Sequence, residues 1–424
     1  MRKILNTAAL LSVLLIISML LSSCGVFYFT YTHEDISSPN ADGLEDIKDP
    51  DAPSTQTPPS QIDFGLSDKF DPTAILGRFH DYNFGGSYIT IATASEKNPL
   101  FPSTGLYVDS NLYSAMSALQ EKFNMSLTKF PSDHETLIAT LENAETSGNN
   151  YADIVAIPLS AVPSFEGKDI FHKISSLPFI SEDADYFAEN KNFGITGEYF
   201  IGGSASYQIS DTKVIFFNTD LIKSLGAVSP YSILSSKKWT WDKLYEYLTF
   251  GKGFASSEDL LAVIKATAGE KSEDTDAAAA ALAEKILPSV ISENAKESFL
   301  NGEALFYLGS LAEANEFSKT DTVFGLLPIP LFEEGKEYRS LHHSDDITVF
   351  ACAKSSPDLE RAAFIISAAN ASCYGSMESL FFSVTENSFL RDNGSNLSLG
   401  YICSAEISVI FPEIESETPG EDAE

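Results

Sequence analysis

One stretch of the chain combines residue types that could hold a metal ion or a small polar molecule. It reads His342-His343-Ser344-Asp345-Asp346, and imidazole together with carboxylate suits zinc or manganese. Adjacent histidines on an extended segment point to opposite sides, so at most one of them could join Asp345 in a single site. We therefore expect no metal here and favour a loop that faces a small-molecule ligand. A metal site and a solvated surface loop are the alternatives.

The sequence lacks the motifs that mark the common catalytic sites. It contains no G-x-S-x-G elbow, no G-x-x-x-x-G-K-[ST] phosphate loop and no H-E-x-x-H zinc motif. Gly202-Gly203-Ser204 is rich in glycine, but it lacks the strand-to-helix setting that a phosphate-binding turn needs. Carboxylates are so numerous that spacing alone identifies no glycosidase pair. We expect no catalytic residue and no cofactor.

Aromatic side chains offer a different chemistry, because a flat ring can stack on the C–H face of a sugar. The candidates are Tyr207, Trp239, Trp241 and Tyr307. Trp241 falls in the first turn of an expected helix, where a place in the core is the alternative. Tyr307 lies in an expected strand that leads to Gly309-Ser310.

Composition narrows the classes of function further. The chain has 424 residues, 44% of them hydrophobic and 12% aromatic, which is enough to build the cores of two or three domains. Its formal charge of −33 argues against a nucleic-acid partner, because a groove for phosphates needs clustered lysine and arginine. Three of the four cysteines lie in the second half, namely Cys352, Cys373 and Cys403. One disulfide bridge and three buried thiols are both open for them.

The N-terminus has the features of a secretory signal. Arg2 and Lys3 precede an apolar run, 4–21, that ends in Leu21-Ser22-Ser23-Cys24. A cysteine directly after Leu-Ser-Ser resembles the bacterial lipobox, whose cysteine is lipidated and becomes the new N-terminus. We expect residues 1–23 to be removed and lipidated Cys24 to hold the protein on the outer face of the cytoplasmic membrane. A transmembrane anchor or an ordinary signal with a chance cysteine is the alternative.

Two segments should lie outside the folded body. Residues 24–84 are acidic and rich in Pro and Ser, so they predict an extended tether, and residues 413–424 predict an acidic tail. The body should begin near Gly85.

The first part of the body alternates between strand and helix patterns. Strands are predicted at 87–94, 125–129 and 151–157, and helices at 111–123 and 137–145. Strand–helix–strand–helix–strand implies a parallel sheet with helices on both faces. Further strands, punctuated by glycine, are predicted within 192–201.

The block 213–244 predicts a buried strand at 214–217, a helix at 220–225 that ends at Gly226, and a second helix capped by Thr240. Later elements are predicted from the same signals. They are an Ala-rich helix at 275–286 opened by Thr275 and Asp276, strands at 304–308, 324–330 and 346–353, and a helix at 359–369 opened by Ser356-Pro357-Asp358.

These blocks resemble the bacterial extracellular solute-binding proteins of sugar-type ABC importers, especially clostridial lipoproteins. The resemblance runs from about Asn83 to Val409 through NFGG (83–86), FFN (216–218) and WTWDKL (239–244). Positions that match in order in the second half are Phe299, Gly302, Ala304, Phe324, Gly325, Pro328, Pro330, Ser356, Pro357, Glu360 and Ala362.

The resemblance implies an α/β, two-lobed periplasmic-binding-protein-like fold of type II, with mixed sheets flanked by helices and a cleft between the lobes. Lobe one would comprise 85–216 and 347–370, and lobe two 217–346 and 371–412, with the hinge where the strand 214–217 begins. The family's cleft-facing turn would follow Tyr307, for which we favour a ligand contact. The expected ligand-binding residues are Glu96, Tyr207, Trp241, Tyr307, Ser310, His343 and Asp345.

As a function, the resemblance implies binding of a small solute, by analogy a carbohydrate, and its delivery to an ABC permease by a monomeric, lipid-anchored protein. No bond would be made or broken. The alternatives are a secreted lipid-anchored hydrolase and a surface interaction protein that kept the fold without the ligand.

Overall fold

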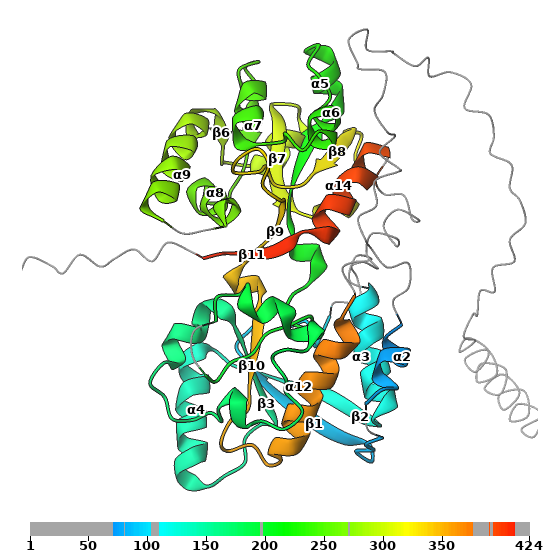
Figure 1. Cartoon of the computed structure of the whole chain (residues 1–424), viewed down its shortest axis with the longest axis vertical. Helices are drawn as coiled ribbons and strands as arrows, with labels where there is room; N and C mark the ends of the chain where they lie inside the picture. Colours follow the sequence, from blue (N-terminus) through cyan, green and yellow to red (C-terminus); the bar gives the residue numbers. More distant parts are fainter. Residues whose placement is uncertain are drawn as a thin grey trace, which may run out of the picture. The chain divides into compact units, whose positions relative to one another are not determined.

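The computed structural model describes residues 71–411 except 80, 103–109, 196–197, 270–271, 376–389 and 391–392 (Figure 1). Cys24, the signal and the acidic tail lie outside the described residues, as does most of the expected tether. Among the helices that are described, none has both the length and the apolar character needed to cross a membrane.

The first sheet has four strands in the order β10-β3-β1-β2. β1 (Ser87–Thr93), β2 (Met125–Pro131) and β3 (Ile154–Pro158) are parallel to one another, whereas β10 (Thr348–Ala351) arrives from far along the chain and pairs antiparallel with β3. All five residues of β3 are buried, as expected of a strand covered on both faces. The predicted strand–helix alternation is confirmed.

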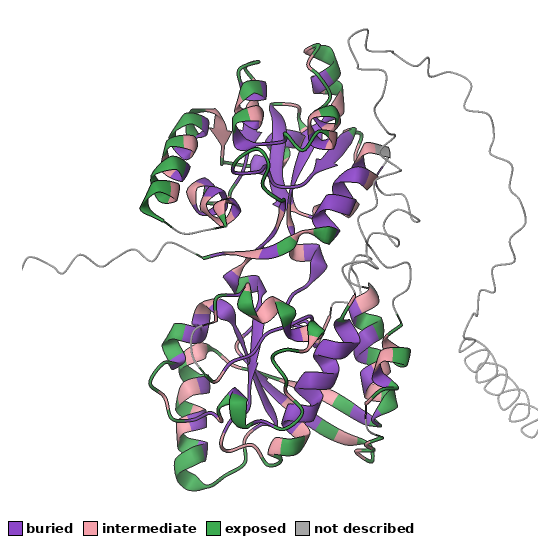
Figure 2. Cartoon of the chain, viewed as in Figure 1, coloured by how far each residue is buried: buried purple, intermediate pink, exposed green. Residues whose placement is uncertain are grey.

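Helices cover both faces of this sheet (Figures 1 and 2). They are α2 (Pro72–Leu76), α3 (Ser110–Lys122), α4 (His134–Ser147) and α12 (Leu359–Cys373). Because alternate residues of a strand point to opposite faces, β3 directs Val155 and Ile157 into the cluster that contains α4. Ile154 and Ala156 enter the cluster that contains α3 and α12.

The second sheet has seven strands in the order β11-β9-β4-β7-β5-β6, with β8 also paired to β4. The strands are β4 (Lys213–Asn218), β5 (Gly253–Ala255), β6 (Val290–Ile291), β7 (Ala304–Ser310), β8 (Phe324–Leu327), β9 (Arg339–His343) and β11 (Glu406–Ile410). The sheet is mixed, because β4 is antiparallel to β7, β8 and β9, whereas β5 is parallel to β7 and β6.

The helices of this half begin at the residues that cap them. Asn218 accepts from the N–H of Leu221 at the start of α5, and Thr240 accepts from the N–H of Lys243 at the start of α7. The helices are α5 (Thr219–Ser224), α6 (Pro230–Ser235), α7 (Trp241–Leu248), α8 (Leu260–Ala268), α9 (Glu273–Ile286), α10 (Ala295–Leu300), α11 (Glu313–Phe317) and α14 (Asn393–Ser404).

Short 3₁₀ helices connect the larger elements. They are η3 (Leu159–Phe165), η4 (Ile174–Ser176), η5 (Asp185–Lys191), η6 (Ile209–Asp211), η7 (Leu287–Ser289) and η8 (Ser344–Asp346).

Both tryptophans of the chain lie in the core of the second half. Trp239 and Trp241 are fully buried, and their indole N–H groups donate to the carbonyl oxygen of Pro328 at 2.9 Å and to Oγ1 of Thr267 at 3.1 Å. Each ring therefore contributes apolar area to the core while its polar edge keeps a partner.

The chain passes between the sheets at two places that are described. The first crossing segment (206–213) leads through η6 into β4, and the second (343–348) leads from β9 through η8 into β10. They lie side by side, because the N–H of Thr348 donates to the carbonyl oxygen of Ser206 at 2.7 Å. The start of the block 213–244 is thus one of the crossings.

Some boundaries differ from those expected. β4 begins at Lys213, so residues 213–216 belong to the second sheet, and α12 continues to Cys373. The folded part also begins before Gly85, since Leu76 of α2 is buried and the ring of Tyr82 lies 4.6 Å from that of Phe364. The acidic composition of residues 24–84 predicts a tether and gives no indication of this contact between Tyr82 and Phe364.

Three local predictions need correction. The described part of 192–201 forms no strand, and Ile201 alone makes an isolated bridge to Phe350. α12 is capped by Asp358 instead of Ser356, because the Asp358 carboxylate accepts from the N–H of Arg361. α9 begins earlier than predicted, because Ser272 and Thr275 form a capping box.

Two of the three cysteines in the second half are free, buried thiols. Burial raises the pKa of both Cys352 and Cys373 to about 12, so both are protonated and unreactive at neutral pH. Cys403 is also buried.

Candidate functional site

Strands of the first sheet end at the crossing segments. Ser95, just after β1, shares a hydrogen bond of 2.8 Å between its Oγ and Oγ1 of Thr348. The N–H of Leu159, just after β3, donates to the carbonyl oxygen of Ile347 at 2.8 Å. The carboxyl ends of β1 and β3 therefore meet the second crossing segment.

Strands of the second sheet end at the same place. After β7, the N–H of Leu311 donates to the carbonyl oxygen of Thr212 at 2.9 Å. Glu258 follows β5 and contacts Lys213, and His343 is the last residue of β9. Ligands of open α/β sheets bind outside the carboxyl ends of strands, so this convergence defines the candidate site.

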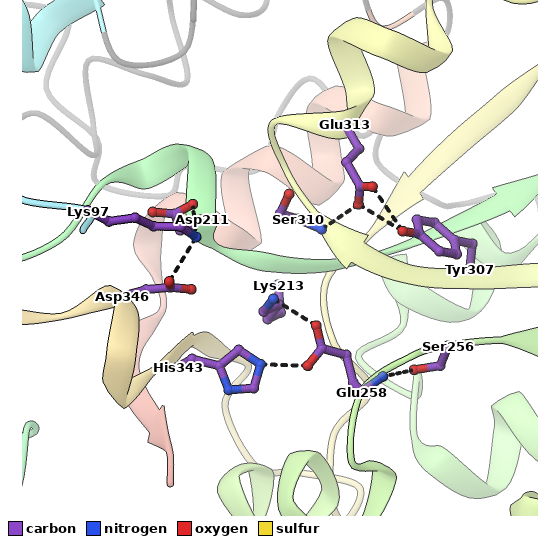
Figure 3. A network of polar contacts seen from close by, with 10 residues as sticks. All are labelled: Lys97, Asp211, Lys213, Ser256, Glu258, Tyr307, Ser310, Glu313, His343 and Asp346. Atoms are coloured by element: carbon purple, nitrogen blue, oxygen red, sulfur yellow. Dashed lines mark hydrogen bonds and ion pairs between the residues drawn. The ribbon is translucent and has the colours of Figure 1, made fainter. Parts of the chain in front are cut away.

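Lys97 joins both crossing segments to the loop after β1 (Figure 3). Its Nζ donates to Oδ1 of Asp211 at 2.9 Å and to Oδ1 of Asp346 at 2.8 Å. Burial would lower the pKa of Lys97, but the bonds to Asp346 and Asp211 outweigh burial and raise the pKa above its ordinary value. Lys97 is therefore positively charged and links the two crossing segments through one ion pair to each.

Glu258 accepts two hydrogen bonds from within the second half (Figure 3). Lys213 Nζ lies 2.8 Å from one carboxylate oxygen, and Nε2 of His343 lies 2.5 Å from the other. Burial alone would raise the pKa of Glu258, but the bond to His343 and the charge of Lys213 outweigh burial and hold the pKa at about 2. The carboxylate is thus ionised throughout the neutral range.

Glu313 organises the end of β7. Its carboxylate accepts from the Tyr307 hydroxyl at 2.9 Å, from the N–H of Ser310 at 2.9 Å and from Lys296 Nζ at 2.9 Å. The ring of Tyr307 stacks with those of Phe216 and Phe299, whose centroids lie 6.1 and 5.8 Å away. Burial, with the nearby Glu313 charge, raises the pKa of Tyr307, so its hydroxyl stays protonated and can donate.

His342 and His343 point to different partners, as their adjacency on a strand predicts. His342 is fully buried, and its Nε2 lies 3.1 Å from Oγ1 of Thr212 on the first crossing segment. Burial lowers the pKa of His342 to about 3, so the imidazole is neutral. His343 is partly exposed and pairs with Glu258.

Two predicted ligand contacts are exposed at the candidate site. Asp345, in η8, accepts a hydrogen bond from the hydroxyl of Ser160, which follows β3. Glu96 is exposed beside Lys97 in the loop after β1. Ser310 and His343 are partly exposed, so the segments that converge here carry carboxylate, hydroxyl and imidazole groups from both halves.

The other predicted aromatic contacts are not available in this structure. Trp241 is fully buried in the second core, so the alternative of a core position holds for it. Tyr207 is buried against His342 and Phe193, with ring centroids 5.2 and 6.4 Å away. Tyr307 lies at the candidate site, but only 6% of its surface is exposed.

Sequence reasoning missed the ion pairs that build the site. Lys97, Lys213, Glu258 and Glu313 were not predicted as site residues, and nothing in the local patterns of Lys97, Glu258 and Glu313 marks them. One signal was present for Lys213: two charged residues, Asp211 and Lys213, stand within the three positions before the fully apolar run 214–217.

The His/Asp cluster forms no metal centre within the described ranges, where no group of three or more His, Cys, Asp or Glu side chains could hold a metal ion. The side chains of His342 and His343 are instead bonded to Thr212 and Glu258.

Solved structures similar to this chain include two proteins described as binding proteins. The sugar-binding protein MalE from the phytopathogen Xanthomonas citri aligns with a TM-score of 0.50 at 11% identity, over 77% of this chain and 87% of that chain. UspC of M. tuberculosis gives 0.49 at 11% identity over 77% and 89%. The ABC substrate-binding protein Lmo0181 from Listeria monocytogenes, in complex with cycloalternan, gives 0.48 at 12% identity over 78% and 89%.

The likeness to the Xanthomonas protein shows the fold. The chain has a two-lobed α/β fold like that of this sugar-binding protein, with mixed sheets flanked by helices, and this confirms the fold class expected from the sequence. No protein-family model matches the chain, and no curated protein sequence matches it.

Proposed function

We propose that this chain is a lipid-anchored, extracytoplasmic solute-binding protein that delivers a small solute to an ABC permease. One observation supports the proposal: strand ends of both sheets converge on the two crossing segments, and Glu96, Ser310, His343 and Asp345 belong to the segments that meet there. A scaffold of this kind binds a ligand between two lobes and needs no catalytic group.

A carbohydrate is the proposed class of solute. The Xanthomonas protein of the same fold is a sugar-binding protein. The exposed carboxylates of Glu96 and Asp345 can accept hydrogen bonds from vicinal hydroxyls, and Ser310 can both donate and accept. The Tyr307 hydroxyl, held by Glu313, becomes a contact if the loop after β7 adjusts.

Delivery would follow from closure of the lobes. We assign residues 71–212 and 347–373 to lobe one, and residues 213–346 and 393–411 to lobe two. Contacts of one solute with Glu96 on lobe one, and with Ser310, His343 and Asp345 on lobe two, would favour the closed state. The permease would recognise that state.

The remaining parts of the proposal rest on the sequence. Lipidated Cys24 would hold the protein on the outer face of the cytoplasmic membrane, and the acidic segment after it would serve as the tether. The proposed protein acts as a monomer and binds no nucleic acid.

A thermal-shift screen against sugars and oligosaccharides tests the binding function. A sugar at a hundred times its Kd should stabilise the folded state by about 2.7 kcal/mol and should compact the protein in solution scattering. Turnover of that sugar would point to a hydrolase instead. A chain that shows neither stabilisation nor turnover with any sugar would be a surface protein that kept only the fold.

Asp345→Ala tests the location of the site. Loss of a hydrogen bond to a charged group should weaken binding by about 1.5–3 kcal/mol, with little change in stability because Asp345 is exposed. Asp169→Ala is the matched control. This exposed aspartate pairs with Lys354, which follows the C-terminal end of β10, and that end lies away from the crossing segments. Full affinity in Asp345→Ala would place the ligand elsewhere.

A further inference from the structure

The basic side chains at the candidate site are already occupied by carboxylates. Lys97 binds Asp211 and Asp346, and Lys213 binds Glu258. At the end of β7, Lys296 Nζ lies 2.9 Å from both Glu313 and Glu316. These three lysines hold the scaffold together, so none of them offers an unneutralised charge to a ligand.

The carboxylates at this edge outnumber the lysines. The negative groups are Glu96, Asp211, Glu258, Glu313, Glu316, Asp345 and Asp346. Seven carboxylates against three lysines leave a formal excess of four negative charges. Much of this charge is shielded from solvent, since the side chains of Asp211, Asp346, Glu258 and Glu313 are less than one-fifth exposed. Charges in such surroundings are screened less than surface charges.

The imidazoles do not reverse this balance. His342 is buried and neutral, because burial lowers its pKa to about 3. His343 directs its Nε2 to Glu258, so that nitrogen is also occupied. Arg339 begins β9, at the end away from His343, and pairs with Glu406, whereas Arg361 pairs with Asp153, which precedes β3 at the end away from the crossing segments.

We propose that the site selects against anionic solutes: it takes a neutral or amine-bearing sugar and rejects sugars that carry carboxylate, sulfate or phosphate groups. This inference rests on the proposed function and adds the charge class of the solute. An anionic group placed here would meet excess negative charge, and the three lysines that the described segments bring to the site are already paired, whereas neutral hydroxyls can donate to the exposed carboxylates.

The test compares sugars that share a backbone and differ in charge. Trisaccharides of glucose and of galactose would be titrated calorimetrically into the whole soluble protein, each as the neutral form, the C6 uronate and the 2-amino form. We expect each uronate to bind about tenfold or more weaker than its neutral counterpart, and the amino form to bind at least as tightly. The difference should shrink as salt is raised.

A charge variant gives an independent measurement. Glu258→Gln keeps an oxygen acceptor for Lys213 but removes the negative charge, so the ratio of uronate to neutral affinity should rise several-fold. Glu246→Gln is the matched control, because it removes a carboxylate paired with Lys243 on the exposed side of α7, and its ratio should not move. If Glu258→Gln does not fold, the wild-type comparison still decides.

The outcomes are distinguishable. Uronate binding equal to or tighter than neutral binding would overturn the charge inference and leave the proposed function intact. If the protein binds none of these sugars and no sugar in the wider screen, the proposed function is overturned and the inference falls with it.

Discussion

Glu258→Gln should lower the free energy of unfolding at neutral pH, and this difference from the wild-type protein should disappear in acid. The pKa of Glu258 is about 2 in the folded protein against an ordinary value of 4.5. At ~1.4 kcal/mol per pH unit, this difference corresponds to about 3 kcal/mol of stability contributed by the ionised carboxylate. Its side chain is only 17% exposed, so solvent screening removes little of this contribution.

The direction of the pH dependence follows from the lowered pKa. A group whose pKa is lower in the folded state contributes fully above its unfolded value, here 4.5, and loses the contribution as pH falls through about 2. Wild-type protein should therefore be about 3 kcal/mol more stable than Glu258→Gln from pH 7 to pH 5. The gap should narrow steadily between pH 4.5 and pH 2, because the protonated glutamate resembles glutamine.

Urea unfolding followed by tryptophan fluorescence is the assay. The chain has two tryptophans, Trp239 and Trp241, and both are buried in the core of the second sheet, so the signal reports the half that contains Glu258. Glu246→Gln is the control on the same half. Its exposed pair with Lys243 should be worth less than about 1 kcal/mol at every pH.

Two results would refute this reasoning. A gap that stays the same at pH 3 and pH 7 would show that the Glu258 pKa is not depressed. A gap below about 1 kcal/mol at pH 7 would show that the contact between Lys213 and Glu258 behaves like a surface ion pair.

Three further predictions follow from other parts of the chain. Cys24→Ala should release or mis-process the protein, and unchanged membrane fractionation without lipid by mass spectrometry would contradict lipidation. Gly203→Ala should lower Tm by several degrees, because an added Cβ would lie 2.4 Å from the Tyr186 carbonyl oxygen and 2.5 Å from Oδ1 of Asn370. An unchanged Tm would show that the loop relaxes to accept the methyl group. Lys97→Met should remove the positive charge that Asp211 and Asp346 share and raise hydrogen exchange at both crossing segments. Lys354→Met, which breaks an exposed pair with Asp169, should not raise it.

Most of the fold could be predicted because its strands and helix starts carry local signals. The run 214–217 is apolar at every position, and Asn218 and Thr240 have the side chains that cap helices. Boundaries failed where a contact distant in sequence decides the structure. The folded part starts before Gly85 because Tyr82 packs on Phe364, a residue far along the chain.

The site was only partly predictable, for a physical reason. An aromatic residue in the first turn of a helix can pack in a core or contact a ligand equally well. The structure shows that Trp241 is fully buried in the core. Tyr207 is buried because an apolar cluster continues through the first crossing segment, where Ile209 also belongs to it, and into β4 at Val214. Neither outcome is visible in local spacing.

The ion pairs of the crossing were hidden by sequence distance, yet their positions have a pattern. Lys213 is the first residue of the buried strand β4, and Asp211 stands two residues before it. Asp346 stands two residues before the first residue of the buried strand β10. Charged side chains are costly to bury unless they are paired. Charged residues at the start of two buried, apolar strands therefore require partners from another element. Lys97 and Glu258 are those partners. A charged residue just before a fully apolar strand is therefore a sequence signal for a place where the chain passes between two sheets.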